Sequence, residues 1–384
     1  MNFEAQIEKY TEILLSHKLM VLIPTLMLIL FATIGARYLE QPSGYRGFVE
    51  TGQPNYEEIL NLEEKYGMID TLSYVIKPNS GDIFQKDVLK LIHELTEISW
   101  KTPYSSRVSS LTNHQYTTVD GDDINIDDFI SDIENLTDEN LVNLRELALA
   151  ENTIVNFILS KSARVAFVNI SLDMPDGMGF DDPINFAEEQ KKLFNKKYPE
   201  VFVTVAGSSR YSHNFQTTAR SDATTMYPGF LILIIILSYV LLRSVTASLI
   251  SLIIIFLSIL PSMGMAGWLG FEAQPPLIIA PILILTIALA HAVHILSIAL
   301  TNLNEGKNKV ESITESLKVN MTPVFLTSLT TAVGVAGVNF GKIPAFSEMA
   351  NTVVIGSAIS FALSVIVLPI LFIIMPIKSH GKSS

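Results

Sequence analysis

Residues 277–300, LIIAPILILTIALAHAVHILSIAL, decide the class of fold. The stretch contains no Asp, Glu, Lys or Arg, and as a helix it is long enough to cross a hydrocarbon core of about 30 Å. Five more apolar runs lie at residues 19–38, 228–242, 247–269, 322–340 and 349–375. The sequence therefore predicts a membrane α-helical bundle of six transmembrane helices, with one helix before and five helices after a large polar region.

The first apolar run, residues 19–38, could also be the apolar core of a secretory signal peptide. It follows a polar leader, it is longer than such a core, and residues 34–37 make a poor cleavage site. We therefore expect an uncleaved membrane anchor.

The distribution of Lys and Arg predicts the orientation of the helices. Six crossings place both termini on one side of the membrane, and cytoplasmic loops carry an excess of basic residues. On one side lie Lys9, Lys18, Arg243, Lys307, Lys309, Lys318, Lys378 and Lys382, whereas the opposite loops at 270–276 and 341–348 contain only Lys342. We expect a multi-pass protein of a bacterial inner (cytoplasmic) membrane, with both termini cytoplasmic.

This topology divides the chain into five parts. They are a cytoplasmic interfacial helix (1–18), transmembrane helix 1 (19–38), a periplasmic α+β domain (39–226), transmembrane helices 2–6 (227–376) and a cytoplasmic tail (377–384). The interfacial helix is predicted because Phe3, Ile7, Tyr10, Ile13 and Leu14 recur at helical spacing. A second short interfacial helix is expected at residues 310–317.

Residues 39–226 carry most of the charge of the chain. They hold 30 Asp and Glu against 16 Lys and Arg, while the whole chain has a net charge of −12. An acidic polar region argues against nucleic acid as a partner. The chain has no cysteine, which excludes disulfides, thiolate chemistry and cysteine metal sites.

The same region has the pattern of an α+β domain. Strand-like segments at 71–76, 107–111, 164–172 and 201–206 alternate with helix-like segments at 84–98 and 183–194. The order is β-α-β, an insertion at about residues 112–160, and β-α-β again. This is the ferredoxin-like pattern, in which two helices cover one face of a four-stranded antiparallel sheet.

The insertion is rich in acidic residues. Asp123, Asn125, Asp127 and Glu134 fall at the first, third, fifth and twelfth ligand places of an EF-hand calcium loop. The glycine that the turn requires after the fifth place is missing, because Asp128 stands there. We therefore favour a solvated acidic face over a metal site, and we expect the helix that follows to be either a mobile flap or a cover for the sheet.

Two histidines lie inside the fourth predicted span. His291 is near the middle and His294 follows three residues later, so both imidazoles lie on one face of a helix. Ionisable groups at membrane depth are costly and are functional candidates by default. Because histidine titrates near neutral pH, the pair could carry protons as access alternates between the two sides. The alternative is two neutral histidines that hydrogen-bond to hydroxyl groups of neighbouring helices.

The fifth predicted span supplies hydroxyl groups for these histidines. Thr327, Thr330 and Thr331 recur at helical spacing and could face them. We therefore include the three threonines with the histidines as candidates for proton coupling.

Glycines recur in two of the spans. Gly264 and Gly267 lie in the third span, and Gly334 and Gly337 lie in the fifth. Small residues let helices approach closely in a membrane, so we expect these glycines to serve helix packing, with a role in helix motion as the alternative.

The chain contains none of the sequence patterns of common enzymes. It has no nucleophile with a base, zinc spacing, phosphate loop or nicotinamide fingerprint. We therefore expect neither an enzyme nor a bound cofactor or metal.

Five stretches carry a resemblance to a known family. They are WKTPYSSRVSSLTN (100–113), GDD (121–123), GMAGWLG (264–270), AHAVHIL (290–296) and PVFLTSLTT (323–331). With the one-plus-five order of helices, they resemble one half of a resistance-nodulation-division (RND) transporter, in the branch of MMPL and Patched-like predicted lipid exporters. The resemblance implies export of lipids or other hydrophobic molecules, driven by proton or ion flux. It also implies a periplasmic lipid carrier and an outer-membrane protein as partners.

Two departures from the family affect the functional prediction. Family members typically carry an aspartate at the position of His291, with a serine at Ala292, and proton coupling is attributed to that aspartate; His294 matches the family's histidine. Either His291 replaces the aspartate or proton coupling is lost. Family proteins also usually contain two such halves, and no second copy of the six-helix pattern occurs here. We expect either a half-size protein that forms a homo-oligomer or joins a second half, or a fragment that ends after the sixth helix.

Three functions fit these observations. The first is an RND-type transporter of lipids or other hydrophobic molecules. The second is a non-pumping accessory or lipid-sensing subunit with a bundle like that of sterol sensors, which the missing aspartate favours. The third is a protein-translocation accessory of the SecD/SecF kind, which has the same order of helices.

Overall fold

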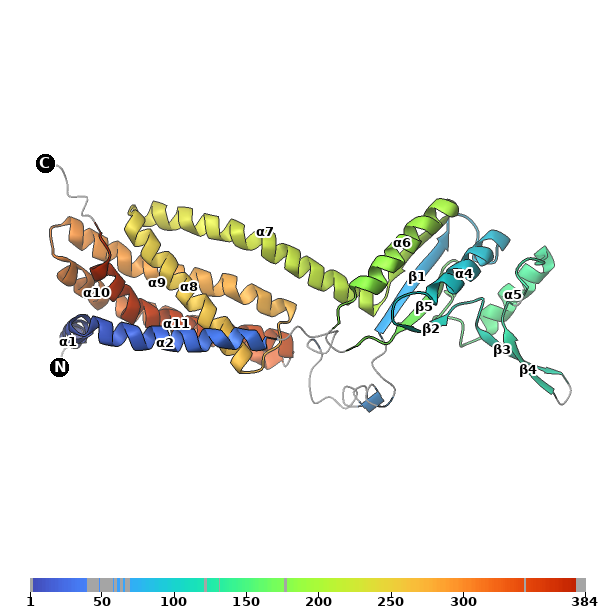
Figure 1. The fold of residues 1–384 in the computed structure, drawn as a ribbon, viewed down its shortest axis with the longest axis horizontal. Coiled ribbons are helices and arrows are strands. Elements are labelled where there is room, and N and C mark those ends of the chain that lie inside the picture. Colours follow the sequence, from blue (N-terminus) through green and yellow to red (C-terminus); the bar gives the residue numbers. More distant parts are fainter. Residues whose placement is uncertain are drawn as a thin grey trace. The chain divides into compact units, whose positions relative to one another are not determined.

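The protein forms two compact units in a computed structural model (Figure 1). The structure describes residues 3–39, 48, 58, 61–62, 65, 70–120, 123–130, 132–175, 178–341 and 343–377. A helical unit comprises Met1–Gly52 and Thr218–Ser384, and a sheet unit comprises Gln53–Thr217. Of the predicted tail at 377–384, residues beyond 377 lie outside the described residues.

Six helices of the described chain are long and apolar enough to cross a membrane. They are α2 (Lys18–Ile34) with its 3₁₀ extension η1 (Gly35–Tyr38), α7 (Ser208–Leu242), α8 (Val245–Trp268), α9 (Pro275–Asn304), α10 (Lys309–Ala336) with the 3₁₀ segment η3 (Gly337–Gly341), and α11 (Pro344–Ile374). The predicted one-plus-five set of apolar helices is therefore confirmed.

Two helices differ from the sequence prediction in length. Residues 310–317, predicted as a separate interfacial helix, are the first turns of α10, because Asn308 caps that helix and Ile313 is fully buried within the bundle. The helix α7 begins at Ser208, and only its part Thr224–Leu242 is apolar enough to span a membrane. The predicted start of transmembrane helix 2 at residue 227 therefore lies inside a continuous helix.

The helices of the helical unit differ in how far they are buried. The most apolar windows of α8, α9 and α11 are 50–56% buried, whereas those of α2 and α10 are 6% and 11% buried. In agreement, α11 packs against α8, α9 and α10. Thus α8, α9 and α11 form the core of this unit, and α2 and α10 leave most of their surface uncovered by the described part of the chain.

The N-terminal helix α1 (Phe3–Ser16) packs on the bundle. Ile7 and Leu14 are buried as the helical spacing predicts, and the Tyr10 hydroxyl donates to the carbonyl of Val365 at 3.0 Å. Ile13, predicted on the same apolar face, is 53% exposed. The helix α1 contacts α10 and α11, so its apolar face packs against the protein. Burial around Tyr10 raises the pKa of its phenol to about 12.

The sheet unit contains a four-stranded antiparallel sheet with the order β2-β5-β1-β6. Along the chain its elements are β1 (Asp70–Pro78), α4 (Lys86–Ser99), β2 (Ser105–Ser109), β5 (Ala166–Leu172), α6 (Asp181–Lys197) and β6 (Val201–Ala206). Helix α4 packs on β2 and β5, helix α6 packs on β6, and the two helices touch (Figure 1). In β1 every second residue faces this core, so Leu72, Tyr74 and Ile76 are fully buried. An α+β domain with the predicted strands and helices is therefore present.

The insertion between β2 and β5 forms a hairpin and a helix, namely β3 (Gln115–Asp120), β4 (Asp123–Asp128) and α5 (Asp138–Ala150). Residues 123–128 form the extended strand β4, where alternate side chains such as those of Asn125 and Asp127 are about 7 Å apart. These two side chains do not wrap around a common centre, so the resemblance to a calcium loop does not extend to the structure. We missed the hairpin because its acidic side chains obscured its alternation.

Candidate functional site

A buried histidine joins three helices in the middle of the helical unit. The side chain of His291, on α9, is 1% exposed. Its Nδ1 lies 3.0 Å from the Ser360 hydroxyl on α11, and its Nε2 lies 3.0 Å from the Ser328 hydroxyl on α10. Both ring nitrogens are therefore satisfied, each by a different helix.

These two serines can serve either protonation state of the imidazole. A neutral ring donates from one nitrogen and accepts at the other, while a charged ring donates from both. A serine hydroxyl can accept in one arrangement and donate in the other, and the Ser328 hydroxyl has the carbonyl of Val324 at 3.0 Å as a second acceptor. Rotation of these hydroxyl groups can therefore keep both ring nitrogens hydrogen-bonded in either protonation state.

Further polar groups line the interior of the bundle near His291. The Ser357 hydroxyl donates to the Ser328 carbonyl at 3.3 Å, and Asn320 donates to the carbonyl and hydroxyl of Ser316. The Ser364 hydroxyl is completely buried and has no hydrogen-bond partner among the described residues. Buried hydroxyls without partners are positions where water inserts in folded proteins.

The predicted threonines do not contact the histidines. Thr327 and Thr330 are exposed on α10, and their hydroxyls donate to the carbonyls of Pro323 and Leu326 in the same helix. Thr331 is partly buried and makes no described hydrogen bond to either histidine. The prediction that threonines of this span face His291 is therefore wrong, because α10 presents Ser328 to α9.

His294 occupies a different environment from His291. It lies one turn further along α9 and is exposed. Two residues three apart on a helix differ by about 60° around its axis, and here this angle separates a buried position from an exposed one. Among the described residues, no polar group hydrogen-bonds to both imidazoles.

The predicted packing glycines divide into two groups. A side chain at Gly264 would lie 2.0 Å from the Ala32 carbonyl oxygen, and one at Gly267 would lie 2.0 Å from the Gly35 carbonyl oxygen. These two glycines therefore allow the backbones of α8 and of α2 with η1 to touch. Gly334 and Gly337 have open space within 4 Å among the described residues, so the packing prediction is wrong for them within one chain.

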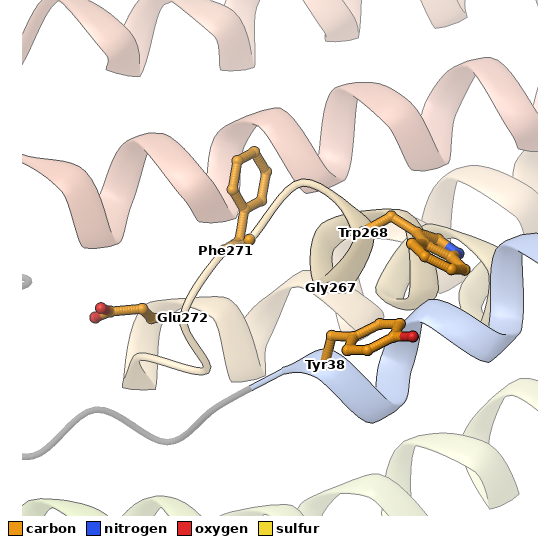
Figure 2. A pocket seen from close by; sticks show the side chains of 6 residues that line it. Tyr38, Gly267, Trp268, Phe271 and Glu272 are labelled. Atoms are coloured by element: carbon orange, nitrogen blue, oxygen red, sulfur yellow. The ribbon is translucent and has the colours of Figure 1, made fainter.

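A second feature of the helical unit is a cavity of 430 Å³ between η1 and the loop from α8 to α9 (Figure 2). Its walls are Tyr38, Gly267, Trp268, Gly270, Phe271 and Glu272. Within the described part of the chain, no group of three or more His, Asp or Glu side chains is placed to hold a metal ion.

Comparison with known proteins assigns the chain to a family of membrane transporters. The model of the MMPL family matches residues 118–377, which include α5, the second half of the sheet and all five C-terminal apolar helices. The chain therefore belongs to the MMPL family of the RND superfamily and is a multi-pass membrane transporter. A search of curated proteins finds no match.

The sequence contained a signal for the serines that we missed. Ser357, Ser360 and Ser364 recur at helical spacing within an otherwise apolar segment, and all three are buried. Polar residues at such spacing in a membrane span indicate a face turned toward the protein interior.

Proposed function

We propose that the protein moves lipids or other hydrophobic molecules and is driven by proton flux, with His291 as the proton carrier. The observation that carries the proposal is the placement of His291 between Ser328 and Ser360 at the centre of the bundle. When the charge of an imidazole changes, the strength of its hydrogen bonds changes too, and here those bonds join it to two neighbouring helices. His291 stands where the family's aspartate would be, and we propose that it takes over the role of that residue.

A cavity in the sheet unit, lined about equally by polar and apolar groups, offers a place for an amphipathic substrate. This cavity of 380 Å³ has apolar walls at Phe129, Ile130, Leu136, Leu144 and Leu147. Asp132 and three asparagines complete its lining. A lining that is part apolar and part polar suits a molecule with an apolar part and a polar part, as lipids have.

We place the sheet unit in the periplasm of a bacterium with an inner membrane, and both termini in the cytoplasm. The basic residues of the short connections support this orientation. The strand order β2-β5-β1-β6 and the two helices on one face support the ferredoxin-like assignment. Assembly as a homo-oligomer or with a second RND half, and exchange with a periplasmic lipid carrier and an outer-membrane protein, belong to the same proposal.

The test is transport by the purified full chain in vesicles that contain a pH-sensitive dye and a fluorescent lipid probe. Under an imposed pH gradient, we expect proton movement and probe transport in the wild type and loss of both, at least tenfold, in His291→Ala. His294→Ala is the matched control, because it removes the same side chain from an exposed position of the same helix, and we expect less than a twofold change. The variant His291→Asp, which restores the family's residue, should keep coupled transport.

Equal activity of wild type and His291→Ala in this assay would exclude His291 as the carrier. If both were silent in the native oligomer, the second function would take the place of the first. That function, a non-pumping accessory or lipid-sensing subunit, is favoured by one observation: both nitrogens of His291 already have partners, as a purely structural histidine requires. A translocation accessory of the SecD/SecF kind would instead respond to a secreted polypeptide and not to the lipid probe.

A further inference from the structure

Helix α11 contains a proline that interrupts its backbone hydrogen bonds. Pro369 lies inside the helix and is buried. In a regular α-helix the carbonyl of Val365 accepts from the amide of residue 369, but proline has no amide hydrogen and its ring crowds that carbonyl. Inside a membrane no water replaces the missing donor. The Val365 carbonyl therefore requires a donor from another part of the chain.

The N-terminal helix α1 supplies this donor. The Tyr10 hydroxyl donates to the Val365 carbonyl at 3.0 Å. Val365 is only 7% exposed, and a buried carbonyl without a partner is costly. Tyr10 thus takes the place of the amide that Pro369 lacks, and it attaches α1 to the interrupted turn of α11.

The preceding turn of α1 is attached to α10. Glu8 pairs with Lys318 of α10, which also pairs with Glu315 at 2.8 Å. The Lys318 side chain is 14% exposed, so solvent screens its pairs less than it screens surface pairs. Ile7 belongs to the same buried apolar cluster as Leu317 of α10. The short helix α1 therefore contacts both α10 and α11 (Figure 1).

The end of α11 beyond Pro369 is also attached to α10. Lys309, in the first turn of α10, donates to the carbonyls of Ile373 and Met375 at 3.3 and 2.7 Å. A helix bends most easily at a proline, because the hydrogen bond that would resist bending is missing there. When α10 moves, it therefore pulls the end of α11 with it, and α11 bends at Pro369.

The same two helices hold the buried histidine. Ser328 of α10 and Ser360 of α11 each lie 3.0 Å from a ring nitrogen of His291. Because α1 is bonded to both helices, α10 can shift against α11 only after α1 gives up its bond to one of them. The attachment of α1 therefore opposes any separation of the two serines.

We propose that α1 is a clamp, formed by Glu8 and Tyr10, that fixes the interrupted turn of α11 and restrains α10. Release of the clamp allows α11 to bend at Pro369 and α10 to shift away from His291. This inference deepens the proposed function, since it names a control on the His291 site. It rests on that function only for the effect of the clamp on proton movement.

Hydrogen–deuterium exchange of the full chain in detergent, without a pH gradient, tests the clamp. Tyr10→Phe removes only the hydroxyl, and exchange of the amides of residues 370–374 should become roughly tenfold faster, because the buried Val365 carbonyl loses its donor. Tyr227→Phe is the matched control. It removes a hydroxyl that donates to the Ile278 carbonyl of α9, whose regular donor, the amide of residue 282, is present. Exchange of residues 370–374 should not change in this variant.

A second substitution tests whether Tyr10 acts through the proline. Pro369→Ala gives the Val365 carbonyl its regular donor, so adding Tyr10→Phe in this background should change exchange of residues 370–374 by less than about twofold. The ionic side of the clamp is tested by Glu8→Gln, which should speed exchange within α1. Glu12→Gln, on an exposed position of the same helix, should leave that exchange unchanged.

Proton movement into vesicles shows whether the clamp controls the histidine. Tyr10→Phe should speed it at least about threefold, because α10 shifts more easily. Unchanged exchange in Tyr10→Phe, or an equal increase in the Pro369→Ala background, would overturn the clamp. Faster exchange with unaltered proton movement would overturn its control of His291. If His291→Ala left transport intact, the proposed function would fail while the exchange results still stood, so the two failures are distinguishable.

Discussion

Replacement of Gly264 by alanine tests whether the contact between α2 and α8 depends on a missing side chain. The new Cβ would lie 2.0 Å from the Ala32 carbonyl oxygen and 2.7 Å from the Thr33 Cα, whereas ordinary contact begins at 3.4 Å. The obstructing atoms are backbone, so they cannot rotate away, and the two helices must separate by about 1.4 Å along this contact. Overpacking of this kind costs about 1–3 kcal/mol.

Thermal unfolding in detergent measures this cost. A loss of about 2 kcal/mol should lower Tm by about 4–8 °C in a unit of this size. Trp268 fluorescence in a Trp100→Phe background reports directly on the contact, because its Nε1 donates to α2 at the Phe31 carbonyl. The reference is Gly334→Ala on α10, where the added carbon meets open space among the described residues. There Tm should stay constant or rise, because alanine in a helix adds up to about 1 kcal/mol to the free energy of unfolding. If both variants melted together with the wild type, the close approach at Gly264 would be refuted.

Three more outcomes follow from individual contacts. Ser328→Ala removes one partner of the buried imidazole and should slow proton movement in vesicles, whereas Thr327→Ala should not, because that hydroxyl donates within its own helix. Lys197→Ala breaks a 2.5 Å ion pair with Glu94 and should destabilise the sheet unit only slightly at pH 7, measured by urea unfolding, because solvent screens an exposed pair. Asn308→Ala removes a capping box and should cost about 1 kcal/mol in thermal unfolding.

The second of these outcomes depends on pH in a defined direction. Partial burial raises the pKa of the Glu94 carboxyl, but hydrogen bonds from Lys197 and Tyr198 outweigh it and lower the pKa below its usual value. A carboxyl whose pKa is lowered by folding contributes stability above its unfolded pKa and loses it as the pH falls through the folded pKa. Wild type and Lys197→Ala should therefore differ at pH 7 and converge as the pH falls through the lowered pKa of the Glu94 carboxyl. A difference that stayed constant with pH would contradict an ionic origin.

The sequence predicts the helical unit well because membrane helices are encoded in simple apolar runs. Hydrocarbon leaves the backbone no partner but itself, so each long apolar run becomes a helix. The errors of the prediction lie in polar segments, to which this rule does not apply. The polar start of α10 is helical because Asn308 caps it. The polar first half of α7 is helical too, and Arg210 there pairs with Glu188 of α6.

The candidate site was predicted only in part because helical spacing does not fix the rotation of a helix. Thr327, Thr330 and Thr331 share a face by spacing, but Ser328, one residue away, faces His291. Threonine hydroxyls can satisfy themselves on a carbonyl four residues earlier, so their burial is not required. The packing of side chains such as the buried Val324 decides which face of α10 meets α9. The spacing of residues along the sequence does not reveal this packing.

The proposed role of His291 as a proton carrier has a structural requirement, because the residue is buried. The ring is 1% exposed, so exchange with either side of the membrane requires one of its two hydroxyl partners to move away or water to enter beside it. Ser360 belongs to α11, the most buried of the apolar helices, whereas Ser328 belongs to α10, which is 11% buried and contains Pro323. The bond between His291 and Ser328 therefore opens at lower cost, because fewer contacts are lost when α10 shifts than when α11 does. By the first of these routes, proton exchange and movement of α10 are one event, which is what coupling requires.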